Sequence, residues 1–187
     1  MIRLLLSVLF VGLSALILAF LQSTTPSYAV LTGPIVTAGV QNDVVSSETF
    51  SIKVDKIVAA KTISFTRYGK PTERQTEGVW VIVNVELQAR RETMTLQAAA
   101  IRGASGRLYR QSHRVDGAPR RVPTKELQPG LPTKGLLVFE MPEDEMHDMT
   151  LIVSRQQAPQ LDSEIRVKLD QGSVETRARA EIGDNGV

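Results

Sequence analysis

Apolar residues at every second position constrain the fold of this chain more than any other feature. The longest run covers residues 79–87, where Val or Leu alternates with other side chains. A period of two places alternate side chains on one face of a β-strand, and β-branched residues disfavour a helix. The opposite face of this run begins apolar, with Trp80 and Ile82, before it turns polar. The run therefore predicts a central strand, covered at that end by a second layer or by a partner, with Trp80 in the core.

The same alternation recurs in shorter segments along the chain. Turn signals rich in Gly or Pro separate several of them, at 103–106 and 128–130, and no convincing amphipathic helix lies between them. We therefore expect an all-β fold, an antiparallel β-sandwich, with a β-barrel as the alternative. The further strands are expected at 50–54, 96–102, 107–111, 133–141, 149–155 and 165–169.

Four motifs follow one another in an order that is seen in a known family. They are GVWVIVNVEL at 78–87, GRLY at 106–109, LQPG at 127–130 and KGLLVFEMP at 134–142. This set resembles the bacterial family of exported, telokin-like immunoglobulin-sandwich domains of unknown function, which includes a mycobacterial secreted antigen. The sequence departs from the family pattern at 89–91 and 131–132, where Ala-Arg-Arg and Leu-Pro replace the usual residues. The resemblance implies an immunoglobulin-like sandwich, exported and often membrane-tethered, that serves as a binding or accessory module.

The amino-terminal segment predicts the location of the chain. Residues 4–21 form an 18-residue stretch without a charge, which is near the lower limit for crossing a bilayer. Arg3 precedes it and the next charged residue is Asp43, so the positive-inside rule places the amino terminus in the cytosol. We expect a single-pass protein of the inner or cytoplasmic membrane, whose carboxyl-terminal domain lies in the periplasm or the extracellular space.

The sequence leaves open whether this segment is removed. Ser27, Tyr28 and Ala29 place small residues at the −3 and −1 positions of a signal peptidase site, so cleavage would follow Ala29. The apolar stretch is longer than the roughly 7–15 residues of a typical signal peptide core, which favours a retained anchor. The expected organisation is a signal anchor or signal peptide at 1–21, a linker at 22–42, a β-sandwich domain at 43–172 and a flexible tail at 173–187.

The sequence lacks the usual signatures of catalysis. It has no cysteine and two histidines, His113 and His147, and it contains no nucleophile elbow, H-E-x-x-H motif, P-loop or dinucleotide fingerprint. Acidic residues gather at 140–148, but their spacing matches no calcium-binding loop, and a solvated turn is the preferred interpretation. We therefore predict that the protein is not an enzyme and that it holds no metal or cofactor.

The basic segment at 107–125 is the best candidate for a binding site. Arginine binds carboxylate and phosphate groups through two parallel hydrogen bonds, so an exposed strip of arginines suits an anionic polymer, lipid head groups or an acidic protein. Asp116 is the only acid within the segment, and Arg90, Arg91 and Arg102 precede it. A solvated loop whose charges only keep the domain soluble is the alternative. The predicted binding residues are Arg107, Arg110, Arg114, Arg120, Arg121 and Lys125.

Charge and location together limit the partners. The formal net charge of +2 gives no reason to expect nucleic acid, and an exported domain would not meet it. The sequence predicts a non-catalytic, membrane-anchored accessory or adaptor module of a cell-envelope complex, with an envelope protein or an anionic polymer as its partner. The alternative is a soluble, secreted ligand-binding protein released after Ala29.

Overall fold

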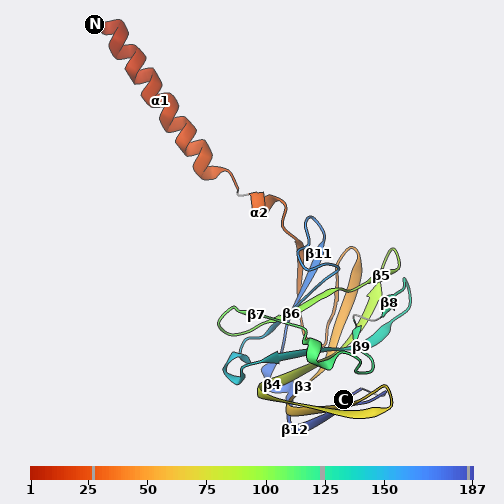
Figure 1. The fold of residues 1–187 in the computed structure, drawn as a ribbon. Helices are drawn as coiled ribbons and strands as arrows, with labels where there is room; N and C mark the ends of the chain where they lie inside the picture. Colours follow the sequence, from red (N-terminus) through yellow and green to blue (C-terminus); the bar gives the residue numbers. More distant parts are fainter. Residues whose placement is uncertain (27, 123–124, 185) are drawn as a thin grey trace. The chain divides into compact units, whose positions relative to one another are not determined.

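Two units make up the chain, Met1–Gly33 and Pro34–Val187 (Figure 1). The computed structural model describes residues 1–26, 28–122, 125–184 and 186–187. The first unit contains helix α1 (Ile2–Thr24) and the short helix α2 (Tyr28–Leu31). The proposed cleavage motif includes Ser27, which lies outside the described residues.

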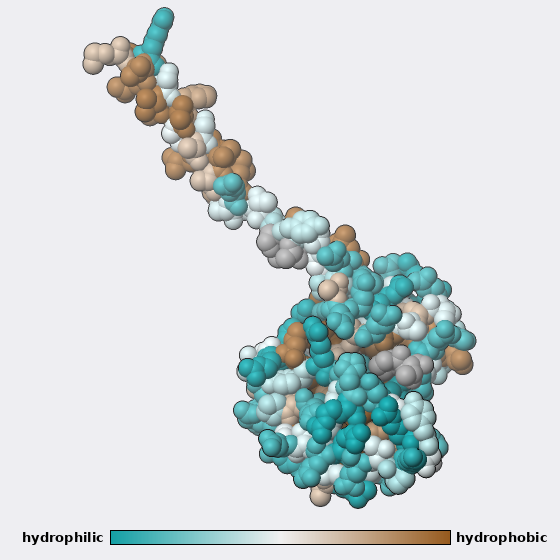
Figure 2. Space-filling model, viewed as in Figure 1, coloured by the Kyte–Doolittle hydropathy of each residue, from teal (hydrophilic) through white to brown (hydrophobic). Residues whose placement is uncertain are grey.

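Helix α1 has the properties of a membrane-spanning segment. By length and composition it can cross a bilayer, and none of its residues is buried. Figure 2 shows apolar side chains along its surface. Ser7 and Ser14 donate hydrogen bonds to the carbonyls of Arg3 and Phe10, at 3.0 and 2.8 Å, so neither hydroxyl would be left unpaired in lipid. The predicted apolar helix at the amino terminus is therefore confirmed.

The strands of the second unit form two main sheets, which we call sheet A and sheet B (Figure 1). In spatial order, sheet A consists of β1 (Ile35–Val40), β11 (Ser163–Lys168), β10 (Thr150–Ser154), β6 (Ala98–Arg102) and β7 (Leu108–Arg110). Sheet B consists of β12 (Val174–Ile182), β3 (Phe50–Arg67), β4 (Lys70–Ala89) and β9 (Thr133–Met141), with β2 (Val44–Ser46) paired to β3. The remaining short elements are β5 (Met94–Thr95), which pairs with β8 (Glu126–Leu127), and the 3-10 helices η1 (His113–Val115), η3 (Glu143–Glu145) and η4 (Gln171–Ser173).

The alternation in β4 is confirmed, because its two faces belong to two separate apolar clusters. Val81 and Val83 point between the sheets into the main core, where they join Phe50 of β3 and Leu151 of β10. Each of the shorter segments expected to be a strand also contains one. The predicted β-sandwich is therefore confirmed, and the space between the sheets is its main core.

The apolar part of the outer face of sheet B is covered by the chain itself. Trp80 of β4 is fully buried there, in a second cluster that includes Val115 and Ala118 from the loop after β7. Ala180 and Ile182 of β12 belong to the same cluster. The layer that the sequence requires over Trp80 thus comes from the same chain, and the predicted core position of Trp80 is confirmed.

The structure corrects the expected linker at 22–42. Strand β1 occupies the last part of that range and pairs in parallel with β11. It lies at the edge of sheet A, and Ile35, Val36 and Val40 are exposed there. An edge strand needs no continuous buried face, so its sequence lacks the alternation that marks β4.

The expected flexible tail at 173–187 is also corrected. Strand β12 runs through it and pairs in parallel with β3. Within β12 only Ala180 and Ile182 are buried, so polar residues dominate its sequence and hide the strand. The parallel pairs β1–β11 and β12–β3 also mean that the sandwich is not purely antiparallel.

Candidate functional site

Side chains that point outward from sheet A form rows across its strands. Because alternate residues of each strand share a face, Arg166, Ile152, Ala100 and Arg110 lie opposite one another on β11, β10, β6 and β7. Ala98 lies on the same face as Ala100, two positions earlier in β6. Short alanine side chains between two long arginines leave a hollow in the middle of this face.

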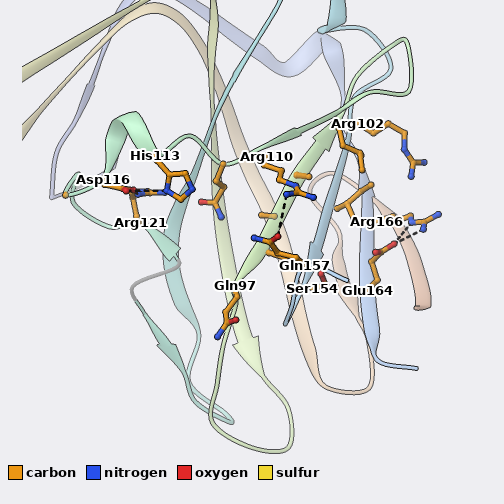
Figure 3. A pocket seen from close by; sticks show the side chains of 17 residues that line it. Gln97, Arg102, Arg110, His113, Asp116, Arg121, Ser154, Gln157, Glu164 and Arg166 are labelled. Atoms are coloured by element: carbon orange, nitrogen blue, oxygen red, sulfur yellow. Dashed lines mark hydrogen bonds and ion pairs between the residues drawn. The ribbon is translucent and has the colours of Figure 1, made fainter. Parts of the chain in front are cut away.

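This sheet A hollow is an open concavity with a volume of about 700 Å³ (Figure 3). Its floor is apolar, and cationic, amide and hydroxyl groups stand around it. The apolar part includes Ala98, Ala100, Leu108 and Ile152, and the polar part includes Arg102, Arg110, Arg166, Gln97, Gln111, Gln157 and Ser154.

The loop at 111–121 forms one wall of the hollow, and both of its ends are bonded to β9. At its start, the amide of Ser112 donates to the carbonyl of Val138 at 3.0 Å. At its end, the carbonyl of Arg120 accepts a hydrogen bond from the amide of Leu136 at 2.9 Å. The middle of the loop packs into the cluster over sheet B. Backbone bonds and packing therefore fix this wall independently of any ligand.

Three of the four arginines that line the hollow differ in their partners. Arg166 donates from Nε to Oε1 of Glu164 at 2.7 Å, and Nη2 lies at the same distance. Arg110 reaches Gln157 only at the limit of hydrogen-bond distance, 3.5 Å. Arg102 forms no side-chain hydrogen bond or ion pair with any residue that the structure describes. The hollow therefore presents guanidinium groups whose positive charge is only partly neutralised.

A second group of charged side chains, Arg121, Asp116 and His113, lies where the loop at 111–121 borders the hollow (Figure 3). The side chain of Arg121 is 8% exposed and forms an ion pair with Asp116, whose Oδ2 lies 3.3 Å from Nδ1 of His113. Burial raises the pKa of Asp116, but the hydrogen bond and charge of Arg121, together with His113, outweigh this effect and lower the pKa overall. Asp116 therefore stays ionised and offsets the charge of Arg121.

The predicted basic strip does not form one surface. Of its six members, Arg110 and Arg121 line the hollow, and Arg121 is buried against Asp116. Arg107 is exposed beside the turn at 103–106 and lies outside the lining. Clustering in the sequence therefore did not produce a continuous cationic strip.

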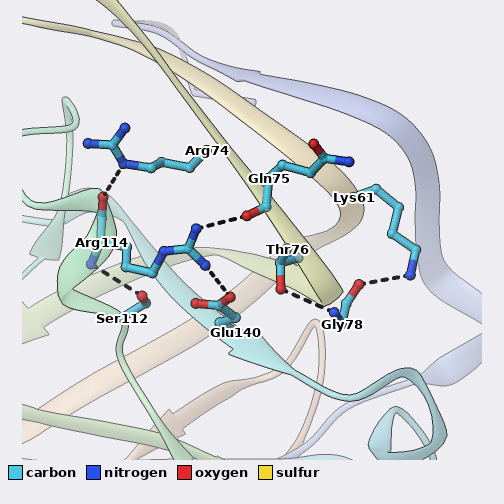
Figure 4. Close-up of polar contacts among 8 residues, drawn as sticks. All are labelled: Lys61, Arg74, Gln75, Thr76, Gly78, Ser112, Arg114 and Glu140. Carbon is cyan, nitrogen blue, oxygen red and sulfur yellow. Dashed lines mark hydrogen bonds and ion pairs between the residues drawn. The ribbon is translucent and has the colours of Figure 1, made fainter.

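Arg114 points toward sheet B instead of the hollow (Figure 4). Its guanidinium lies 5.2 Å from the ring centre of Trp80 and donates to the carbonyl of Gln75 at 2.8 Å. It also forms an ion pair with Glu140 of β9. The cation over the buried ring and the two polar contacts hold the loop on sheet B, and Arg114 does not line the hollow.

Arg120 and Lys125 also bind groups within the sandwich. Arg120 donates to the carbonyl of Asp184 at 3.3 Å, and Lys125 donates to the carbonyl of Lys134 at 2.7 Å. Burial, followed by the charge of Arg120, lowers the pKa of Lys125. Neither side chain lines the hollow.

Sequence analysis missed two members of the hollow, Arg102 and Arg166, as binding residues. Each occupies a position where the strand alternation points outward, Arg166 between the buried Ile165 and Val167, and Arg102 after the buried Ile101. This signal places both arginines on outer faces. It does not reveal that β6 and β11 both pair with β10, which is what brings them to one face.

The arrangement suits the binding of an anion. His113 contacts Asp116, and Nδ1 of His147 lies 2.8 Å from the side-chain nitrogen of Gln171. Among the described residues, no group of three or more His, Asp or Glu side chains is placed to hold a metal ion. Guanidinium, amide and hydroxyl groups around an apolar floor can recognise carboxylate or phosphate groups by hydrogen bonds.

The fold and the site together define a β-sandwich domain with one open, cationic outer face. No family model matches the sequence, and a search of curated proteins finds no match. Among solved structures, the chain is similar to the yjhA protein from Bacillus subtilis, with 17% identity, a TM-score of 0.54, and coverage of 71% of this chain and 99% of that chain. At this identity the similarity supports the fold alone, and for the fold it agrees with the family resemblance of the sequence.

Two further solved structures are similar to this chain. One is a secreted protein from Mycobacterium tuberculosis, MPT63, with 16% identity, a TM-score of 0.46, and coverage of 72% of this chain and 97% of that chain. The other is an uncharacterized β-sandwich protein from Clostridium difficile, with 11% identity, a TM-score of 0.47, and coverage of 77% of this chain and 99% of that chain.

Proposed function

We propose that this protein is a non-catalytic, membrane-anchored β-sandwich, exported across the cytoplasmic membrane, that acts as an accessory or adaptor module in a cell-envelope complex. Helix α1 serves as the anchor, with the amino terminus in the cytosol and the sandwich in the periplasm or the extracellular space. The uncharged helix after Arg3 supports this orientation. The contact surface is the hollow on sheet A rather than the whole basic strip.

One observation carries this proposal. The outer face of sheet B is covered by the chain around Trp80, whereas that of sheet A holds Arg102 and Arg110 over an alanine floor without an acidic partner among the described residues. Unpaired guanidinium groups around a concave surface attract anionic groups and bind them in a fixed geometry. A binding role is favoured over catalysis because His113, the histidine in the lining, contacts Asp116 but no serine or threonine hydroxyl among the described residues, and it belongs to no motif of an activated nucleophile.

The anchor is tested by determining the amino-terminal residue of the mature protein and the protease sensitivity of the sandwich in intact spheroplasts. We expect Met1 at the amino terminus, retention in the membrane after a high-salt wash, and digestion of the sandwich from outside. A mature protein that begins at Val30 would replace the anchor with the secreted, ligand-binding alternative. A protected sandwich in intact spheroplasts would overturn export itself.

The contact surface is tested with heparin as a polyanionic probe and the full chain in detergent micelles. Replacing Arg102, Arg110 and Arg166 by Gln should lower the salt concentration needed for elution. The matched control replaces the exposed Lys70, Arg107 and Lys134 by Gln, which removes the same charge outside the hollow. An equal loss in both variants would mean that binding follows net charge, and the hollow would then not be the contact surface.

A further inference from the structure

We infer that the sheet A hollow binds an extended acidic peptide segment of an envelope partner, with two carboxylate side chains four residues apart and an apolar side chain midway between them. This inference rests on the proposed contact surface and names what occupies it. The argument comes from the spacing of Arg166 and Arg110, from the apolar floor between them and from the partial neutralisation of the charge.

The spacing of the two end arginines matches an extended peptide that crosses the strands. Arg166 and Arg110 stand in one row, separated by β10 and β6, so their backbones are three strand spacings apart. At about 4.8 Å for each spacing, this distance is roughly 14 Å. Residues i and i+4 of an extended chain are about 13 Å apart and point to the same side. A carboxylate at each of these positions can therefore meet one guanidinium at each end of the row.

The floor between the arginines suits an apolar side chain at position i+2. Ile152 and Ala100 lie in the row between Arg166 and Arg110, and Ala98 continues the floor along β6. A polymer that carries charge along its whole length has no group to place on such a floor, and desolvating a charge there is unfavourable. A side chain such as Leu or Val gains by burial at the same point.

The charge of the hollow also favours a ligand with few anionic groups. Glu164 is bonded to Arg166, and Asp116 is paired with Arg121, so two acids stand among the four arginines of the lining. A guanidinium has five N–H donors, and Glu164 takes only Nε and one Nη of Arg166, which leaves donors for a ligand carboxylate. Two carboxylates match the remaining charge of Arg102, Arg110 and the partly engaged Arg166.

The amide side chains of the lining suit a peptide backbone. Gln111 lines the hollow, but its Oε1 is buried below the surface, so the amide groups that a ligand can reach are those of Gln97 and Gln157. A peptide backbone carries N–H donors, whereas ionised phosphate groups carry none. The amide groups of Gln97 and Gln157 can contact the same backbone.

The experiment measures fluorescence polarisation of labelled peptides with the full chain in detergent micelles. The probe has the core Glu-Ser-Leu-Ser-Glu, and a matched peptide of the same composition places the two Glu residues next to each other. A third peptide replaces Leu by Ser. We expect the spaced peptide to bind at least tenfold more tightly than the other two.

Protein variants locate the binding site. Ala100→Leu fills the floor, and Arg110→Gln removes one end of the row, so each should lower affinity for the spaced peptide at least tenfold. Arg107→Gln is the matched control, because Arg107 is an exposed arginine near β7 that does not line the hollow. A thermal melt of each variant checks its folding, and Arg110→Gln keeps the test decisive if Ala100→Leu fails to fold.

The outcomes separate this inference from the proposed function. Equal affinity for the spaced and adjacent peptides would overturn the inference, because the distance between Arg166 and Arg110 would then not select the spacing of the two carboxylates. Tighter binding of inorganic polyphosphate than of the spaced peptide, unaffected by Ala100→Leu, would identify an anionic polymer as the occupant and leave the contact surface standing. If the wild-type protein binds neither the peptide, nor polyphosphate, nor heparin, both the inference and the contact surface are overturned.

Discussion

The two outer faces of the sandwich differ in how far the chain covers them. Over sheet B, the loop at 111–121 and strand β12 bury Trp80 and Ile82 completely. Over sheet A, outward side chains such as Arg102 and Ala100 are only half-buried, and the hollow remains open. Closing the first face uses segments that contribute little to the main core. The open face is therefore the one available for a partner, and the closed face serves stability.

The largest difference in stability between the two faces is expected for a charge introduced on the closed face, which is the outer face of sheet B around Trp80 and Ile82. Ile82→Asp places a carboxylate in the apolar cluster around Trp80, where Ile82 is fully buried. Burial of an unpaired charge should destabilise the domain by more than about 4 kcal/mol and unfold it. Circular dichroism of the full chain in detergent micelles would report the loss of β-structure.

The matched control for this change is Thr150→Asp on the outer face of sheet A. Thr150 lies opposite Arg102 and Lys168 and is half-buried, so a carboxylate there can pair with a cation and reach water. This variant should keep the wild-type spectrum and melt cooperatively. If Ile82→Asp melted like the control, the closed face would not be packed as described.

A smaller effect is expected where the loop is held on the closed face. Arg114→Ala removes the guanidinium over Trp80 together with its contacts to Glu140 and the carbonyl of Gln75. Arg114 is about half exposed, so solvent weakens these interactions, and we expect a loss of about 1–2 kcal/mol in the free energy of unfolding. Urea unfolding measures this loss, and Trp80 emission should shift to longer wavelength as water reaches the ring.

Arg107→Ala is the control for Arg114→Ala, because it removes an arginine of the same predicted strip that does not contact sheet B. It should leave both the unfolding midpoint and the Trp80 emission unchanged. Equal effects of the two changes would mean that the strip acts through its total charge and that Arg114 has no special role.

The closed face also shows which parts of the fold are readable from the sequence. The run at 79–87 predicted a strand with a core face and a second covered face, because the alternation of side chains is a local property of each strand. Strands β1 and β12 were missed, since edge strands with few buried residues carry a weak pattern. Parallel pairing with β11 and β3 could not be inferred, because pairing direction depends on contacts between distant segments.

The candidate site was predictable only in its chemistry. Arginines were expected to form it, and Arg110 does so. The strip failed as a surface because the loop after β7 turns its side chains alternately toward sheet B, as with Arg114, and toward the hollow, as with Arg121. Arg166 joins Arg110 only through the pairing of β11, β10, β6 and β7, which no local pattern encodes.

Acid should weaken the closed face through β12. The hydrogen bond from Arg177, followed by that from Lys56 of β3, lowers the pKa of Glu175 from 4.5 to about 2. A carboxylate whose pKa is lower in the folded state stabilises the fold above pH 4.5, and this contribution is lost as the pH falls toward about 2. The difference in unfolding free energy between wild type and Glu175→Gln should therefore shrink over this window.

Urea unfolding at a series of pH values between 7 and 2 tests this effect, and because Glu175 is exposed the difference should be small throughout. Glu48→Gln, which removes an exposed carboxylate paired with Arg91 outside β12, reports the general effect of losing one acid. A constant difference between wild type and Glu175→Gln across the window would show that the ion pairs of Glu175 with Arg177 and Lys56 do not stabilise the fold.

The smallest effect on stability is expected on the open face. Arg102→Gln removes a guanidinium that contacts no described partner, so the free energy of unfolding should change by less than about 0.5 kcal/mol. Urea unfolding beside Arg114→Gln provides the comparison, since both changes remove one partly exposed arginine. A loss for Arg102→Gln as large as that for Arg114→Gln would mean that the open face is also structural. Unchanged stability, together with weaker binding to heparin, would separate stability from recognition on opposite faces of one sandwich.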